Sequence, residues 1–228
     1  MPTPPRAPDG TPIEVRPILR DELDRILLRC WPEDPAEIEE LFDLQETIGM
    51  AAWEAGRSVG MLHCYRVEAP GGTNEYWPEW NGWWNAGERT FGAWGPLKAD
   101  LGVEGPAWCH ACMHVGRTLE TGESDQPDSR YFGRGIGTAL ARESVRWAAE
   151  RDYAAVVAPG APHDLPYLAQ WMGCLPWTTY ERLGFEPFTA HLRNEEDAPG
   201  WARGEVHDPI ASEVREALEG RRDLHDIL

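Results

Sequence analysis

The segment from Tyr131 to Leu140 constrains the fold of this chain more than any other. Its glycines at alternate positions, Gly133, Gly135 and Gly137, lead straight into a stretch with helical periodicity. Because glycine has no Cβ, such a backbone can approach a ligand closely. The unpaired N–H groups of the helix N-terminus, with the positive end of the helix dipole, then face that ligand. The segment therefore predicts an anion-binding loop, suited to phosphate groups, at the start of a helix.

A second informative segment runs from Tyr180 to Phe185 and reads Tyr-Glu-Arg-Leu-Gly-Phe. Together the two segments resemble the GNAT superfamily of acyl-CoA-dependent N-acyltransferases. The first is similar to the family's pyrophosphate-binding loop, and the second to the helix and Gly-Phe turn that carry its tyrosine acid. The family's loop begins with Gln or Arg. When this chain is aligned with that loop so that the helix starts at the right place, Phe132 occupies the Gln or Arg position. An alternative alignment begins the loop at Arg130, which matches the family's Arg but starts the helix too early. We therefore use the alignment that begins at Phe132.

Apolar periodicity predicts the remaining elements. In chain order they are a strand over 13–19, helices over 20–30 and 35–46, strands over 48–54, 58–68 and 108–115, a helix over 135–151, a strand over 153–158, a helix over 176–183 and a strand over 185–192. This order predicts an α/β domain with a mixed sheet. It is also the order of the GNAT fold. The helix over 135–151 is expected to carry Ile136, Leu140, Ser144 and Trp147 along one face.

The domain organisation follows from composition. Residues 1–12 are rich in proline and are expected to be a disordered lead-in, whereas 13–192 form one GNAT-like domain. A Trp-rich insertion over 69–106 separates the third and fourth strands, and 193–228 form an acidic C-terminal extension with a short helix. Neither a signal core nor a membrane-spanning stretch is evident, so a cytoplasmic location is expected.

Charge and cysteine content exclude several functions. A formal net charge of −18 disfavours nucleic-acid binding and repels anionic membrane surfaces. It serves either solubility alone or the attraction of a cationic acceptor. An odd number of cysteines, five, without a secretory signal indicates reduced thiols rather than a disulfide framework. A homodimer is one option for the assembly.

The resemblance implies a site for acetyl-CoA or another short acyl-CoA as co-substrate. The residues expected to bind it are Val115, Phe132, Gly133, Arg134, Gly135, Ile136, Gly137 and Thr138. Tyr180 is expected to protonate the departing CoA thiolate, a task that suits a phenol, and the alternative is a core tyrosine. A strand amide near Val115 is expected to stabilise the oxyanion of the tetrahedral intermediate.

The strand over 108–115 carries the candidate base. A period of two places His110, Cys112 and His114 on one face. Alternate residues lie nearly 7 Å apart, so zinc, with ligands at about 2.0–2.3 Å, cannot easily bridge all three, and we expect no metal. We assign His110 as the catalytic base, with His114, Asp164 and acids of the insertion as alternatives. The alternative is that these histidines are satisfied core residues.

The insertion is the candidate acceptor site. Five of the chain's twelve tryptophans gather there, at positions 77, 80, 83, 84 and 94. It is either a hydrophobic flap or an aromatic acceptor pocket, for which Trp83 and Trp84 are the proposed contacts. Indole faces bind flat rings and cations alike, so the acceptor is expected to be cationic or aromatic.

The sequence therefore predicts an N-acetyltransferase that moves an acetyl or other short acyl group from CoA to a primary amine of a small molecule. Two alternatives stay open. One is a protein or peptide N-acetyltransferase, and the other is a non-catalytic acyl-CoA-binding regulatory module, which would need the glycine loop but not Tyr180.

Overall fold

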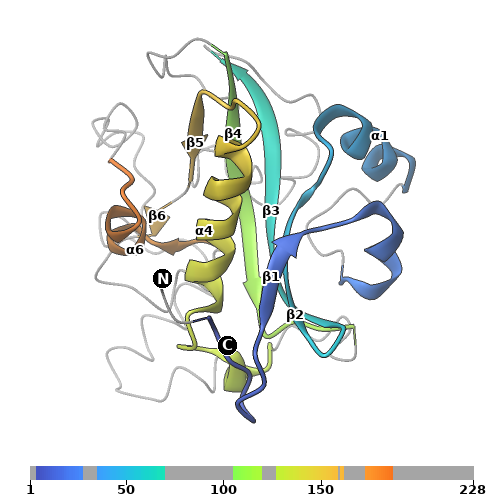
Figure 1. The fold of residues 1–228 in the computed structure, drawn as a ribbon, viewed down its shortest axis with the longest axis vertical. Coiled ribbons are helices and arrows are strands. Elements are labelled where there is room, and N and C mark those ends of the chain that lie inside the picture. Colours follow the sequence, from blue (N-terminus) through green and yellow to red (C-terminus); the bar gives the residue numbers. More distant parts are fainter. Residues whose placement is uncertain are drawn as a thin grey trace, which may run out of the picture.

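A computed structural model describes residues 4–27, 35–69, 105–119, 127–158, 160–161 and 173–186. At its centre lies a five-stranded sheet with the order β1-β2-β3-β4-β5 (Figure 1). The strands are β1 (Glu14–Pro17), β2 (Gly49–Glu54), β3 (Arg57–Ala69), β4 (Gly105–Val115) and β5 (Ala155–Val157). The first four pair antiparallel, whereas β5 runs parallel to β4. The predicted α/β domain with a mixed sheet is confirmed.

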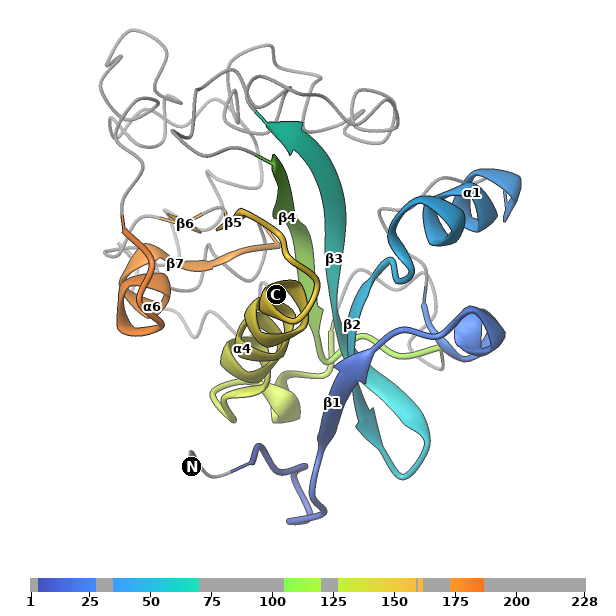
Figure 2. The ribbon, with the colours of Figure 1, turned by 45° about the horizontal axis from the view of Figure 1, so that its top comes forward.

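Helices cover both faces of the sheet (Figure 2). The helix α1 (Pro35–Gln45) and the 3-10 helix η1 (Arg20–Arg25) lie on one side, and α4 (Ile136–Ala149) lies on the other. A second 3-10 helix, η2 (Ser129–Tyr131), precedes the glycine loop. The helix α6 (Trp177–Arg182) packs beside a small parallel sheet of β6 (Gly160–Ala161) and β7 (Leu175–Pro176).

Each face of the sheet has its own apolar core. On one face, α4 buries the side chains predicted from its periodicity, namely Ile136, Leu140, Ser144 and Trp147. The indoles of Trp147 and Trp108 lie with ring centroids 4.5 Å apart, which holds the helix against β4. On the other face, α1 packs Ile38, Leu41 and Phe42 against side chains of β2 and β3. Successive side chains of a strand point to opposite faces, so the same strands contribute residues to both cores.

Some predicted elements differ from the structure. The helix predicted over 20–30 is a 3-10 helix that ends at Arg25, because Ile26 is extended (φ −120°, ψ 134°). β4 begins at Gly105, where it pairs with Ala69. Residues 6–12, expected to be disordered, form a turn closed by an Arg6–Pro12 bridge, and Ala7 is fully buried in the core.

Other predictions fall outside the described residues. They concern nearly all of the insertion, including Trp83 and Trp84, most of the strand predicted over 185–192, and the C-terminal extension. Phe185 and Glu186, which are described, are not in a strand. Within the described ranges, no helix is both long and apolar enough to cross a membrane.

Candidate functional site

The glycine loop has the backbone that its sequence predicts. Gly133 and Gly135 have φ angles of +67° and +76°, in the left-handed region that side chains disfavour, and Gly135 is the N-cap of α4. A Cβ built on either residue meets no atom of the described residues within 4 Å. Space beside the loop is therefore open at both glycines. The glycines are needed there for backbone conformation, and they leave room for a ligand to approach.

The N–H groups of this loop are available for an anion. From Gly133 to Thr138, no backbone N–H has an acceptor among the described residues. The first one to be bonded is that of Ala139, which donates to the Gly135 carbonyl at 2.9 Å. These donors lie at the N-terminus of a 14-residue helix, whose dipole adds to their attraction for negative charge.

The arginines beside the loop are engaged elsewhere. Arg130 forms a bidentate ion pair with Asp128, with a closest N–O distance of 2.6 Å. The Arg134 guanidinium donates to the main-chain carbonyls of Arg130 and Ala7. Phe132, at the position of the family's Gln or Arg, is half-buried. In this arrangement an anion at the loop would be held by the main chain.

Gly137 is constrained by packing instead. A Cβ there would lie 2.9 Å from both the Met113 sulfur and the Leu175 side chain, and 4.0 Å from the Val115 side chain. The start of α4 thus sits directly on the last residues of β4. The structure therefore brings predicted residue Val115 next to the predicted loop.

A bulge in β4 overturns one prediction. His63 pairs with Cys112 and Cys64 with His110, so Ala111 is an extra residue between the two pairs. His110 consequently faces α4, whereas Cys112 and His114 face the side of α1. The prediction that the three residues share one face is wrong, because it assumed an unbroken alternation along the strand.

His110 lies in a buried polar cluster beneath α4. Its Nε2 is 3.0 Å from the Ser144 hydroxyl, which also accepts a 2.8 Å hydrogen bond from the Trp108 indole. The His110 side chain is fully buried, and burial lowers its pKa to about 3. The imidazole is therefore neutral at physiological pH. Sequence reasoning placed Ser144 on the helix face but missed its polar role.

Tyr180 stands beside His110, with ring centroids 6.0 Å apart, and its ring also packs edge-on against Phe185 at 5.0 Å. Its hydroxyl is buried and has no hydrogen-bond partner among the described residues. Burial raises the pKa of Tyr180 well above its usual value, although the nearby Leu175 amide acts in the opposite direction. The phenol is therefore protonated at physiological pH. The structure brings these two predicted residues together.

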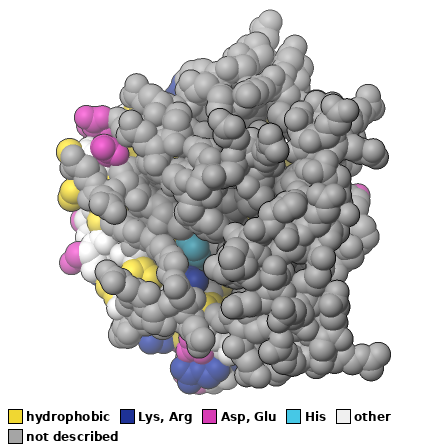
Figure 3. Space-filling model, turned by 180° about the vertical axis from the view of Figure 1, so that it is seen from behind, with side chains coloured by type: hydrophobic (Ala, Val, Ile, Leu, Met, Phe, Trp, Pro, Cys, Tyr) yellow, Lys and Arg dark blue, Asp and Glu magenta, His cyan; other side chains and the backbone are white. Residues whose placement is uncertain are grey.

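A second polar cluster lies on the face of the sheet away from α4. There the Cys112 sulfur is 3.2 Å from His114 Nε2, and the Tyr65 hydroxyl is 2.7 Å from His63 Nε2. Burial, and next to it the charge of His114, lowers the pKa of His63 well below its usual value. His114 is the most exposed of the three described histidines, at 9%. A histidine side chain is visible from this side of the molecule (Figure 3).

The edge of β4 changes partner along its length. β5 pairs with it only from Ala107 to Cys109. Further on, the Met113 N–H donates to the Gly173 carbonyl at 2.6 Å, so residues leading into β7 border this part of the strand. The N–H of Val115, two residues later, is expected on the same edge.

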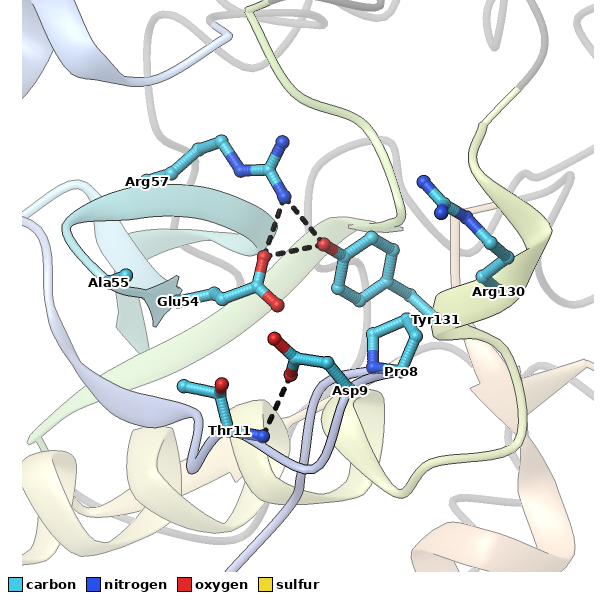
Figure 4. Close-up of a pocket in the computed structure, with 8 residues that line it drawn as sticks. All are labelled: Pro8, Asp9, Thr11, Glu54, Ala55, Arg57, Arg130 and Tyr131. Carbon is cyan, nitrogen blue, oxygen red and sulfur yellow. Dashed lines mark hydrogen bonds and ion pairs between the residues drawn. The ribbon is translucent and has the colours of Figure 1, made fainter.

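An open cavity of about 490 Å³ lies beside the start of the loop (Figure 4). Its lining residues are Pro8, Asp9, Thr11, Glu54, Ala55, Arg57, Arg130 and Tyr131. Within it, the Tyr131 hydroxyl donates to Glu54 at 2.6 Å and accepts from Arg57 at 2.7 Å. Burial raises the pKa of Tyr131 to about 12. These bonds tie η2, and with it the loop, to the turn between β2 and β3.

Among the described residues, no group of three or more potential ligands could hold a metal ion. The structure gathers the predicted cofactor residues at the start of α4 and the predicted His110 and Tyr180 beneath that helix. The predicted acceptor contacts, Trp83 and Trp84, lie outside the described residues.

No protein-family model matches the chain, and no curated protein matches its sequence. Solved structures do match. An aminoglycoside acetyltransferase from an uncultured soil metagenomic sample is 16% identical, with a TM-score of 0.46 over 78% of this chain and 95% of the other. The aminoglycoside N-acetyltransferase AAC(6')-Iy, in complex with CoA, is 15% identical, with a TM-score of 0.43 over 78% and 90% of the chains.

A GCN5-related N-acetyltransferase from Ralstonia eutropha JMP134 is 19% identical, with a TM-score of 0.39 over 78% of this chain and 94% of the other. All three of these solved structures are acetyltransferases.

Proposed function

We propose that this protein is an acyl-CoA-dependent N-acyltransferase, which moves an acetyl or other short acyl group to a primary amine of a small molecule. The observation that carries the proposal is the run of N–H groups from Gly133 to Thr138, none of which has an acceptor in the part of the chain that the structure describes. It begins at left-handed glycines with open space beside them and leads into the N-terminus of α4. Such an array suits a pyrophosphate, the anionic group of CoA nearest to its reactive arm.

The reaction needs the amine and the thioester to be held in attack geometry, which converts a bimolecular step into an effectively intramolecular one. The amine nitrogen bonds to the thioester carbon, and the resulting oxyanion is stabilised by N–H donors beside it. Val115 lies next to the loop and five residues beyond His110 along β4, so its N–H is proposed to bond the pantetheine arm instead. When the C–S bond breaks, Tyr180 gives its proton to the sulfur. A buried, protonated phenol beneath α4, with its ring next to that of His110, supports this role.

The base is better assigned to His114 than to His110. An amine must lose a proton before or during its attack, and the acceptor of that proton should titrate near neutral pH. His110 is fully buried with a pKa of about 3, so it is a weak base. His114 lies on the opposite face, beside the Cys112 thiol and close enough to His63 to lower its pKa. We therefore propose that the proton of the amine passes to His114, through water because this residue lies on the opposite face of β4 from Tyr180.

The acceptor is proposed to be cationic or aromatic. A net charge of −18 attracts cations, and the tryptophans of the insertion offer faces for flat rings and ammonium groups. Trp83 and Trp84 remain the proposed contacts. The proposal places the enzyme in the cytoplasm, where acyl-CoA is available, and a homodimer is one assembly consistent with it.

The proposal is tested by measuring free thiol release from acetyl-CoA with a panel of aromatic amines, polyamines and amino sugars. Release that depends on both the amine and the enzyme is expected for at least one small molecule. If only peptide or protein amines support release, the enzyme is a protein acetyltransferase. If CoA binds but no amine supports release, the protein is a binding module and the proposed catalytic role of Tyr180 is wrong.

A further inference from the structure

His110 occupies a particular place in the sheet. The last pair between β4 and β5 joins Cys109 to Val157, so His110 is the first residue of β4 after the two strands part. Its side chain points to the α4 face, toward Tyr180. It therefore stands beside the proposed acid rather than on the face of the proposed base.

The hydrogen bonds around Ser144 decide which nitrogen of His110 carries the proton. An indole N–H can only donate, so the Ser144 oxygen is the acceptor of the 2.8 Å bond from Trp108. The Ser144 hydroxyl is then free to donate, and His110 Nε2 at 3.0 Å is a nearer and stronger acceptor than the Cys64 sulfur at 3.5 Å. A ring that accepts at Nε2 carries its proton on Nδ1 when neutral.

This assignment leaves two buried donors on neighbouring rings, whose centroids lie 6.0 Å apart. His110 Nδ1 and the Tyr180 hydroxyl are both shielded from solvent, and neither has a hydrogen-bond partner among the described residues. An unsatisfied buried donor is costly to folding, and native proteins keep few of them without a functional reason. Two such donors at the point where β4 and β5 part indicate a ligand that brings its own acceptors.

We infer that His110 donates its Nδ1–H to the acyl carbonyl oxygen of the bound thioester, next to the sulfur served by Tyr180. This inference rests on the proposed acyl transfer. As the amine nitrogen bonds to the carbonyl carbon, the π electrons move to the oxygen, and the bond from Nδ1 strengthens with the growing negative charge. The carbonyl then reforms, the C–S electron pair goes to sulfur, and sulfur takes the Tyr180 proton. The proton that the amine nitrogen loses goes to the proposed base, His114. The imidazole itself stays neutral throughout.

Burial suits His110 to this role, since a neutral imidazole donates a hydrogen bond without taking a proton from the amine. Trp108 and Ser144 act through His110 as positioning residues. They hold the tautomer that presents the N–H, and they do not touch the substrate.

Two variants of His110 separate a donor from a base. His110→Asn keeps an N–H close to the position of Nδ1, whereas His110→Leu keeps only the volume. We expect kcat to fall by about 10²–10³ in the Leu variant, the usual effect of losing one oxyanion donor, and by less than about tenfold in the Asn variant. The KM for acetyl-CoA and the pH profile of kcat/KM should change little in either. If kcat falls equally in both variants and the acidic limb of the kcat/KM pH profile disappears, His110 acts as a base and the inference is overturned.

The tautomer can be measured independently of activity. In ¹⁵N-histidine NMR spectra of the free wild-type protein, His110 should show a protonated Nδ1 and an unprotonated Nε2. Ser144→Ala should allow both tautomers and lower kcat with little change in the KM for acetyl-CoA. A protonated Nε2 in the wild-type protein contradicts the inference. Absence of acyl transfer by the wild-type protein refutes the proposed function instead, and the NMR result still shows whether His110 presents the N–H.

Discussion

Tyr180 provides a prediction in which activity and stability move in opposite directions. Tyr180→Phe removes one hydroxyl and almost no volume. That hydroxyl is buried and its proton has no acceptor among the described residues, so none of them offsets the desolvation of this donor. Removing an unsatisfied buried hydroxyl should raise the free energy of unfolding by about 1–3 kcal/mol. For a chain of this length the melting temperature should rise by about 2–4 °C per kcal/mol.

Turnover should change in the other direction. If Tyr180 protonates the CoA thiolate, its loss should lower kcat by about 10²–10⁴ and leave the KM for acetyl-CoA nearly unchanged. Thermal unfolding monitored by circular dichroism and the thiol-release assay measure the two effects on the same sample. A site that keeps an unsatisfied group for its reaction should become more stable and less active together.

Tyr131→Phe is the matched control. Its hydroxyl bonds to both Glu54 and Arg57, so its removal should lower stability by about 1–3 kcal/mol without a direct effect on turnover. A Tyr180→Phe variant that melts below the wild-type protein and keeps full activity would refute the reasoning. In that case the hydroxyl has a structural partner and another group protonates the thiolate.

Three further predictions concern pH, backbone strain and the acceptor. The free energy of unfolding should fall as pH drops below about 6.5. Burial holds the pKa of His110 near 3 while an unfolded histidine titrates near 6.5, so the unfolded state binds the additional proton. In urea titrations, His110→Asn should therefore reduce the dependence of the unfolding free energy on pH. Gly116→Ala should lower the free energy of unfolding by about 2–4 kcal/mol, because Gly116 has a φ of +79° and a Cβ there would clash with the Asp128 carbonyl oxygen. A urea unfolding midpoint equal to that of the wild-type protein would contradict this. Replacing Trp83 and Trp84 with Ala should raise the KM for the amine and leave the KM for acetyl-CoA nearly unchanged. If both KM values change together, the insertion is a structural flap.

The glycine loop could be predicted because its determinants are local. Left-handed backbone at Gly133 and Gly135 requires glycine, and the periodicity from Ile136 onward requires a helix. Each side chain of α4 that was predicted to be buried is buried, since one helix face alone decides it. Strong local signals of this kind do not depend on the rest of the fold.

The faces of β4 could not be predicted because they depend on a partner strand. The extra residue at Ala111 is visible only in the pairing of β4 with β3, and it moves His114 to the face opposite His110. Sequence reasoning therefore treated two histidines with different environments as equivalent. Ser144 gave a signal that could have been used, because a serine in an apolar helix stripe needs a buried polar partner.

The central claim, that the start of α4 binds the pyrophosphate of CoA, is tested most directly by calorimetric titration of Gly135→Glu with CoA. The substituted side chain would enter the space open beside the loop and bring a negative charge to it. Gly10→Glu is the control, since Gly10 has a φ of +91° and equally open surroundings, so backbone strain and net charge change alike. We expect Gly135→Glu to lose CoA binding while Gly10→Glu keeps wild-type affinity. Unchanged affinity in a folded Gly135→Glu variant would contradict the account.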